Sequence, residues 1–156
     1  MNALIVYFSY SGNTRKLVEG IEEELHLPVV EIERETPYSP DYDTCAYKEA
    51  KEEWEGKICP KIKKIVLDVS SFDKVLLFYP IWWYTHPMVV ESFAKTCLKD
   101  YKGEVYLFAN SYTNDPSYLR NTLKDLNGLG MGVEFKEGLF NKGLEEHLSF
   151  IGKILG

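Results

Sequence analysis

The chain has 156 residues, of which 45% are hydrophobic and 27% charged, a composition typical of one folded globular domain. Its 24 acidic and 18 basic side chains give a formal net charge of −6, which argues against nucleic-acid binding because that function needs a concentrated basic face. The longest nearly unbroken apolar run, 75–84, contains a proline and is far shorter than the ~20 residues of a membrane-spanning helix.

The cysteines and the N-terminal residues indicate the compartment. Cys45, Cys59 and Cys97 are widely spaced and include no Cys-x-x-Cys pair, which favours reduced, packed thiols over a disulfide framework or a zinc site. An apolar strand pattern begins within two or three residues of Met1, with no basic region and cleavage site before it. We therefore expect a cytoplasmic protein with no membrane segment.

In chain order, the first half predicts two strands and two helices. The apolar run 3–8 is typical of a strand buried on both faces, and a helix with apolar residues at helical spacing follows at once and ends near His26. A short strand is predicted at 29–32, and a connection rich in proline and tyrosine follows it. A helix capped by Asp43 or Thr44 then runs through Trp54 to a stop at Gly56, and the segment after it is either a loop with a short helix or an extended piece.

The second half continues the alternation of strands and helices. The predicted strands are 75–79, 105–109 and 133–137, and the predicted helices are 87–101, 116–126 and 143–155. Such alternation predicts an α/β fold, a doubly wound parallel sheet with helices on both faces. In this architecture a ligand lies beyond the carboxyl ends of the strands, so the loops after the first, third and fourth strands should meet at one edge.

The first of these loops has the chemistry of a phosphate site. It offers hydroxyl and backbone N–H donors at the start of a helix, where the helix dipole favours an anion, and it consists of Ser9, Tyr10, Ser11, Gly12, Asn13 and Thr14. One glycine and no lysine exclude the nucleoside-triphosphate loop, and the same single glycine excludes the dinucleotide fingerprint. The alternative is a turn in which one of these residues merely caps the helix.

The second and third loops have the chemistry of a site for a flat ring. Three large aromatic rings follow a strand end within the second loop, which consists of Pro80, Ile81, Trp82, Trp83, Tyr84 and Thr85. Such rings stack on planar ligands, although one of the two tryptophans could instead pack under a neighbouring helix. The third loop could contact the ring from the other side, or could be only a polar helix entry, and comprises Asn110, Ser111, Tyr112 and Thr113.

Two of these loops resemble those of flavodoxins. The first matches the phosphate loop Ser/Thr-x-Ser/Thr-Gly-Asn/x-Thr, and the Pro-Ile-Trp-Trp sequence resembles the second loop of one flavodoxin subgroup, where it runs beside the isoalloxazine ring. The resemblance implies non-covalently bound FMN and a five-stranded sheet in the order 2-1-3-4-5, which flavodoxins share. Family members commonly have glycine after the paired tryptophans and in the third loop, whereas this chain has Tyr84 and the run 110–115.

The resemblance leaves three functions open. The first is an electron carrier whose redox partner proteins dock at the flavin edge, in a monomer or weak dimer. The second is an FMN-dependent NAD(P)H or quinone reductase with a second pocket built by the aromatic connection 37–54. The third is a flavodoxin-like fold that no longer binds flavin. A phosphorylated receiver domain is excluded, because Tyr79 and Pro80 stand where an aspartate would be needed.

Several other residues have two interpretations each. Arg15 could approach the phosphate or face solvent, and His86 could gate a proton or be solvated. The aromatic side chains of the 37–54 connection could fold over the ring as a lid or form a separate apolar cluster, and these are Tyr38, Tyr42, Tyr47 and Trp54.

Overall fold

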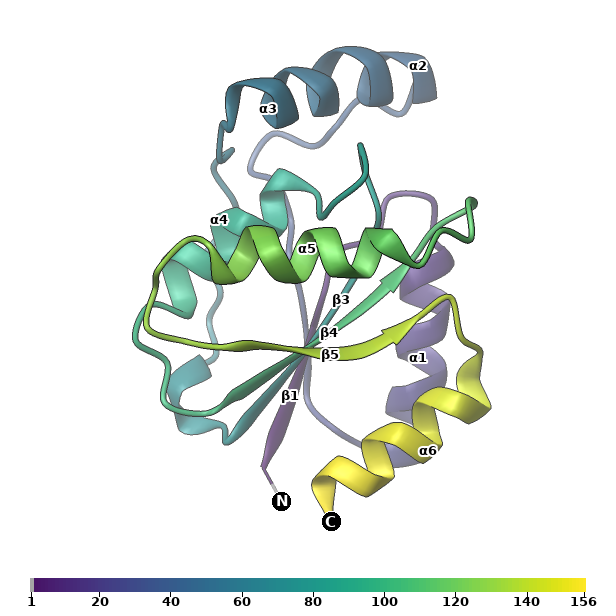
Figure 1. Ribbon diagram of the computed structural model, residues 1–156, viewed down its shortest axis with the longest axis vertical. Coiled ribbons are helices and arrows are strands. Elements are labelled where there is room, and N and C mark those ends of the chain that lie inside the picture. Colours follow the sequence, from purple (N-terminus) through teal and green to yellow (C-terminus); the bar gives the residue numbers. More distant parts are fainter. Residues whose placement is uncertain (1) are drawn as a thin grey trace.

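The computed structural model describes residues 2–156 and is built around a parallel sheet of five strands (Figure 1). The strand order is β2-β1-β3-β4-β5. The strands are β1 (Ala3–Tyr7), β2 (Val29–Glu31), β3 (Lys74–Pro80), β4 (Glu104–Asn110) and β5 (Phe135–Phe140). Both the predicted fold class and the predicted strand order are confirmed.

Helices cover both faces of this sheet. On one side lie α1 (Asn13–Leu25) and α6 (Leu144–Leu155), and on the other lie α4 (Met88–Cys97) and α5 (Ser117–Asn127) (Figure 1). A further helical segment between β2 and β3 stands above the carboxyl edge, and it consists of α2 (Tyr42–Thr44), the π-helical turn Cys45–Ala50 and α3 (Lys51–Gly56). A short 3₁₀ turn, Val69–Ser71, precedes β3.

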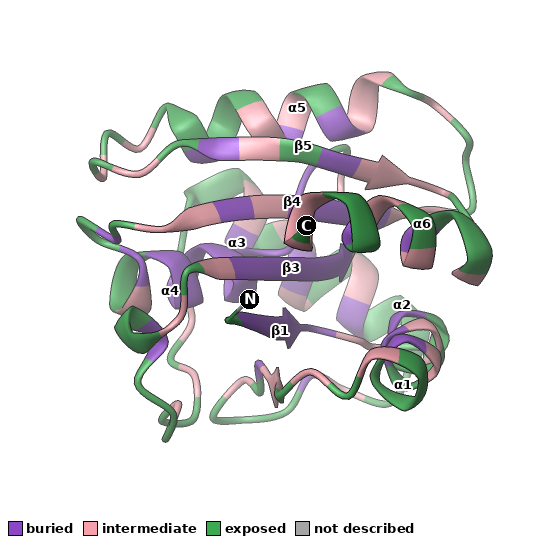
Figure 2. Cartoon of the chain, turned by 90° about the horizontal axis from the view of Figure 1, so that it is seen from below, coloured by how far each residue is buried: buried purple, intermediate pink, exposed green. Residues whose placement is uncertain are grey.

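The central strands are apolar throughout because both of their faces are buried. Side chains alternate along a strand, so Leu4 and Val6 join the core under α4 and α5, whereas Ile5 and Tyr7 join the core under α1 and α6. Figure 2 shows β1 and β3 buried along almost their whole length. Burying one leucine or isoleucine contributes about 1.5–3 kcal/mol, so this two-sided core supplies the main driving force for the fold.

The structure corrects two boundaries in the first half of the chain. The cap of the 42–56 helical segment is Asp41, whose Oδ2 accepts hydrogen bonds from the backbone N and the hydroxyl of Thr44, and not Asp43 or Thr44. The ambiguous segment 57–67 contains neither a helix nor a strand, and an isolated antiparallel bridge joins Ile62 to Arg34.

Two further boundaries differ in the second half. The helix predicted at 87–101 ends at Cys97. The last strand, predicted at 133–137, lies at Phe135–Phe140, with a shift of register against β4 between Leu107 and Ala109. Gly138 lies within this strand at a close approach of two backbones, and a glycine interrupts the local pattern from which strands are predicted.

Two observations bear on the remaining expectations. Cys45 is buried, Cys59 and Cys97 are partly buried, and all three are free thiols. Within residues 2–156, no helix combines the length and the apolar character that a membrane span requires.

Candidate functional site

The loops after β1, β3 and β4 lie side by side at the carboxyl edge of the sheet. The hydroxyl of Thr14 donates to Asn110 Oδ1 at 2.7 Å, which links the first loop to the third. The backbone N–H of Ile81 donates to the carbonyl of Asn110 at 2.8 Å, which links the second loop to the third. The rings of Tyr10 and Trp82 are 5.8 Å apart, so the first and second loops are also in contact.

The first loop presents backbone N–H groups around the start of α1. The Oγ of Ser9 accepts from the backbone N of Gly12 and of Arg15, both at 3.2 Å. Gly12 has φ 101°, a left-handed conformation that favours glycine. Within residues 2–156, the backbone amides of Ser11 and Asn13 have no acceptor, and neither has that of Thr14. These free donors, at the positive end of the helix dipole, suit an anion.

Two side chains near this loop have other partners. The Thr14 hydroxyl is buried and committed to Asn110, so in this conformation Thr14 offers a ligand its amide and not its hydroxyl proton. The guanidinium of Arg15 is paired with Glu31, and this hydrogen-bonded ion pair raises the pKa of Arg15. Arg15 is therefore directed to the neighbouring strand β2.

The second loop is a tight turn over residues 82–85. Backbone hydrogen bonds connect Trp82 and Thr85 in both directions, at 2.8 and 3.3 Å. The two central residues have positive φ, 51° for Trp83 and 72° for Tyr84, although neither is glycine. Flavodoxins with a similar second loop commonly have glycine at the position of Tyr84, and glycine adopts this backbone conformation without strain. This chain adopts the same conformation with a tyrosine.

The two tryptophans have different surroundings. Trp82 is enclosed by the edges of other rings, with centroid distances of 5.2 Å to Phe8 and 5.1 Å to Tyr38. Trp83 stacks on Trp54 of α3 at 5.6 Å, with 16° between the ring planes, and its Nε1 donates to the carbonyl of Ala46 at 2.8 Å. Trp83 is therefore the tryptophan that packs against a neighbouring helix.

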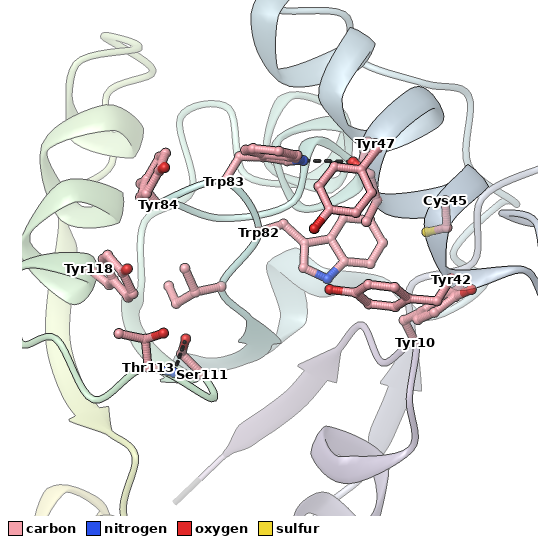
Figure 3. Close-up of a pocket in the computed structure, with 13 residues that line it drawn as sticks. Tyr10, Tyr42, Cys45, Tyr47, Trp82, Trp83, Tyr84, Ser111, Thr113 and Tyr118 are labelled. Atoms are coloured by element: carbon pink, nitrogen blue, oxygen red, sulfur yellow. Dashed lines mark hydrogen bonds between the residues drawn. The ribbon is translucent and has the colours of Figure 1, made fainter.

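A cavity of about 350 Å³ lies between the second loop, the third loop and the 42–56 helical segment (Figure 3). Its volume is within the range of small-molecule and cofactor sites. No charged side chain is among the lining residues, which are Tyr10, Tyr42, Cys45, Ala46, Tyr47, Ala50, Ile81, Trp82, Trp83, Tyr84, Ser111, Thr113 and Tyr118. Burial raises the pKa of the Cys45 thiol to about 11, so this thiol is neutral at pH 7. The cavity therefore suits a flat ring without a strong charge.

The structure places the predicted site residues in three groups. Seven of them line the cavity, namely Tyr10, Ile81, Trp82, Trp83, Tyr84, Ser111 and Thr113. Five surround the helix start beside it, namely Ser9, Ser11, Gly12, Asn13 and Thr14. Pro80, Thr85, Asn110 and Tyr112 are outside the lining; Tyr112 is 93% exposed, and Asn110 connects loops.

The aromatic connection 37–54 forms one wall of the cavity. The sequence predicted some of the residues in this wall but not others. Tyr42 and Tyr47 line the cavity, in agreement with a lid, whereas Tyr38 belongs to the core. Sequence reasoning missed Cys45, Ala46 and Ala50, because small and apolar residues carry no chemical signal. It also missed Tyr118, although an aromatic side chain in the first turn after a site loop is a signal that could have been used.

A buried ion pair anchors this wall to the rest of the molecule. Glu53, on α3, is 5% exposed; its carboxylate accepts from the hydroxyl of Tyr38 at 2.5 Å and lies 3.0 Å from the guanidinium of Arg34. Burial raises the pKa of Glu53, and the guanidinium of Arg34 also packs over the Tyr38 ring at 4.3 Å. Both partners are present and hydrogen-bonded, which is the condition for a buried pair to persist.

His86 is not solvated, contrary to one of the two expectations. Its side chain is buried under the second loop, with Nε2 2.9 Å from Glu91 Oε2 and Nδ1 3.0 Å from the hydroxyl of Thr122. The loop position did not predict this, because burial depends on α4 and α5 packing beneath the loop.

The comparisons with known proteins agree with this geometry. Residues 2–150 match a protein-family model described as Flavodoxin. The chain belongs to the flavodoxin family. A crystal structure of a flavoprotein in complex with FMN from Lactobacillus acidophilus NCFM is 21% identical, with a TM-score of 0.79, and the match covers 96% of this chain and 98% of that one. No curated protein sequence matches this flavodoxin-family chain.

Two further structures share the fold. One is a crystal structure from Bacteroides eggerthii DSM 20697, with 22% identity, a TM-score of 0.82 and coverage of 99% of this chain and 98% of that one. The other is the solution structure of two-electron reduced Megasphaera elsdenii flavodoxin, with 18% identity, a TM-score of 0.58 and coverage of 97% and 98%. At these identities the likeness extends to the fold alone.

Proposed function

We propose that this flavodoxin-family protein binds FMN non-covalently and carries electrons to partner proteins. The observation that supports this most directly is the arrangement of donors and aromatic rings at the carboxyl edge of the sheet. Free backbone amides of Ser11, Asn13 and Thr14 surround the start of α1 beside an uncharged, aromatic cavity. One part of the site suits a phosphate and the other a flat ring, which are the two ends of FMN. The Lactobacillus acidophilus flavoprotein, which was crystallised in complex with FMN, supports the same choice of cofactor.

Different residues of the chain would bind the phosphate and the ring of FMN. The amides at the start of α1 would hold the phosphate, with the helix dipole adding to the attraction. Trp82, Tyr10 and Tyr118 would contact the ring and exclude water from it. FMN, when bound, supplies the electron-accepting and electron-donating chemistry, and the protein supplies placement and electrostatic environment.

Partner proteins would dock where the cavity opens to solvent. Tyr42 and Tyr47 are each 60% exposed and Tyr84 is 54% exposed, so the opening is rimmed by accessible aromatic residues. Exposed acids on the same helical segment, such as Asp43, would attract a positively charged partner.

The deciding experiment is a titration of the purified protein with FMN. We expect a yellow complex with quenched flavin fluorescence, and no binding even at high FMN would contradict both redox functions and leave a fold that no longer binds flavin. We also expect Ser11→Ala to weaken FMN roughly tenfold more than riboflavin, because it removes a hydroxyl donor beside the free amides and only FMN carries the anion. Thr14→Ala removes the hydroxyl that links the first loop to the third, so it should weaken both flavins alike.

The matched control for these variants is Ser149→Ala, an exposed serine on α6, which should leave both affinities unchanged. Equal losses of FMN and riboflavin in Ser11→Ala would contradict the phosphate site.

A reductase is the second candidate, and the wall formed by residues 42–50 favours it. Tyr42 and Tyr47 add exposed ring surface at the cavity opening, where a nicotinamide or quinone could stack. Steady-state assays with NADH or NADPH and a quinone separate the two candidates, since a carrier should turn over slowly without a separate reductase.

A further inference from the structure

The turn that forms one wall of the cavity has an unfavourable backbone. Trp83 and Tyr84 both have left-handed φ values without being glycine. Non-glycine residues persist in such conformations only where surrounding contacts hold them, and such contacts concentrate around ligand sites. The contacts that stabilise this turn therefore also determine the shape of the cavity wall.

Three side-chain hydrogen bonds hold the turn from outside. Trp83 is held by its bond to the carbonyl of Ala46. Asn121 Nδ2, on α5, donates to the carbonyl of Tyr84 at 2.9 Å. The hydroxyl of Thr85 donates to Asp125 Oδ2, also on α5, at 2.7 Å. Each of the three residues after Trp82 in the turn therefore has its own hydrogen-bond partner outside the turn.

A buried polar chain supports the end of the turn from below. His86 Nδ1 lies 3.3 Å from the hydroxyl of Thr85 and 3.0 Å from that of Thr122, and Nε2 contacts Glu91. Burial raises the pKa of Glu91, but hydrogen bonding and charge from His86 and from Lys95 outweigh it, and the net shift is downward. Glu91 is therefore a carboxylate that accepts the proton on His86 Nε2.

Core packing accounts for only part of the polar arrangement on α5. Asn121, Thr122 and Asp125 are spaced so that all three reach the turn or the histidine beneath it. Thr122 is fully buried, and a buried polar side chain costs free energy unless its hydrogen bonds are satisfied. Its hydroxyl contacts both His86 and the hydroxyl of Tyr79, whereas the side chains of Asn121 and Asp125 bond to the turn itself.

We propose that Asn121, Thr122 and Asp125, together with His86 and Glu91, form a clamp that positions the turn 82–85 as a wall for the flavin ring. These are positioning residues, since none of them lines the cavity. The inference rests on the proposed function. It has one specific consequence: the clamp should affect binding of the ring and leave binding of the phosphate unchanged.

The test replaces Thr85 with two residues of similar size. Thr85→Val removes the hydroxyl that reaches Asp125, whereas Thr85→Ser keeps it. We expect Thr85→Val to weaken FMN and riboflavin by the same factor, roughly tenfold, because the turn loses a hydrogen bond that positions it against α5. Thr85→Ser should bind both within about twofold of the unmodified protein. Asp125→Ala, which removes the acceptor, should behave like Thr85→Val.

A readout without flavin tests the clamp separately from the proposed function. The indole N–H of Trp83, bonded to Ala46, should exchange with solvent faster in Thr85→Val and Asp125→Ala than in the unmodified protein, as measured by NMR. The matched control is Lys124→Gln, an exposed position next to Asp125 on α5. If the unmodified protein binds neither flavin, the proposed function fails while the exchange measurement still decides whether the clamp exists.

Three results would overturn the inference. One is unchanged indole exchange in both Thr85→Val and Asp125→Ala. Another is an equal loss of flavin affinity in Thr85→Val and Thr85→Ser. The third is a loss confined to FMN, which would assign the network to the phosphate. Should Thr85→Val fail to fold, Asp125→Ala carries the test, because Asp125 is exposed and its replacement does not disturb the core.

Discussion

For single residues in this chain, backbone conformation matters as much as side-chain chemistry. Gly12 occupies a left-handed conformation in the loop before α1, and glycine is suited to it. Tyr84 occupies a similar conformation with a side chain that resists it. The tyrosine gains ring contacts with Trp54 at 5.9 Å and Tyr118 at 6.1 Å in return.

A pair of substitutions at Tyr84 separates the backbone from the ring. Tyr84→Gly and Tyr84→Ala both remove the ring, but only glycine adopts φ 72° without strain. We expect the glycine variant to have the higher free energy of unfolding, by about 1 kcal/mol, in urea denaturation. At Tyr112, which is exposed and does not have positive φ, the same pair should give the opposite order. The same order at both positions would contradict the strain.

At the scale of elements, close contacts between neighbouring strands and helices set positions that local sequence leaves open. The α2 to α3 segment becomes a cavity wall because Glu53 reaches Arg34 and Tyr38. The last strand continues through Gly138, where an added Cβ would lie 2.4 Å from the carbonyl oxygen of Leu107 and 2.8 Å from the Phe108 ring. Both features depend on approaches between segments far apart in the chain.

Gly138→Ala tests the approach of β5 to β4. Because backbone must move to accept the methyl group, we expect the free energy of unfolding to fall by about 2–3 kcal/mol in urea denaturation. The control is Gly152→Ala on α6, where an added Cβ meets nothing within 4 Å. This variant should be more stable by about 0.5–1 kcal/mol, because alanine is the better helix former. Similar effects at both glycines would refute the close approach.

At the scale of the whole molecule, charge is the property that acts on the proposed cofactor. The net charge of −6 opposes further negative charge on a bound flavin. One negative charge ~10 Å away, at an effective dielectric constant of ~20, contributes about 1.7 kcal/mol, or roughly 70 mV for a one-electron step. We therefore expect a low reduction potential.

The dependence of this potential on salt tests the argument. Raising the ionic strength from ~0.01 to ~0.5 M shortens the screening length from ~30 Å to less than ~10 Å, so the midpoint potential of the FMN-loaded protein should rise by tens of millivolts. Asp43→Asn, next to the cavity, should raise the potential at low salt more than Glu24→Gln at the far end of α1. A potential independent of salt would show that distant charges do not control it.

Much of this architecture followed from local pattern. Continuous apolar strands, alternating with amphipathic helices, predicted a two-sided parallel sheet, because a strand with both faces buried must be apolar along its length. The hydroxyl-rich loop at 9–14 and the aromatic loop at 80–85 could likewise be recognised, since their chemistry lies in consecutive residues and parallel topology brings strand ends together.

Tertiary contacts decided the rest. The partner of Thr14, the cavity wall at 42–50 and the clamp under Thr85 join residues that are tens of positions apart, and no local spacing encodes them. His86 shows the reason most clearly. A histidine in a loop is solvated unless other elements cover it, and here α4 and α5 supply both the cover and the hydrogen-bond partners that make its burial tolerable.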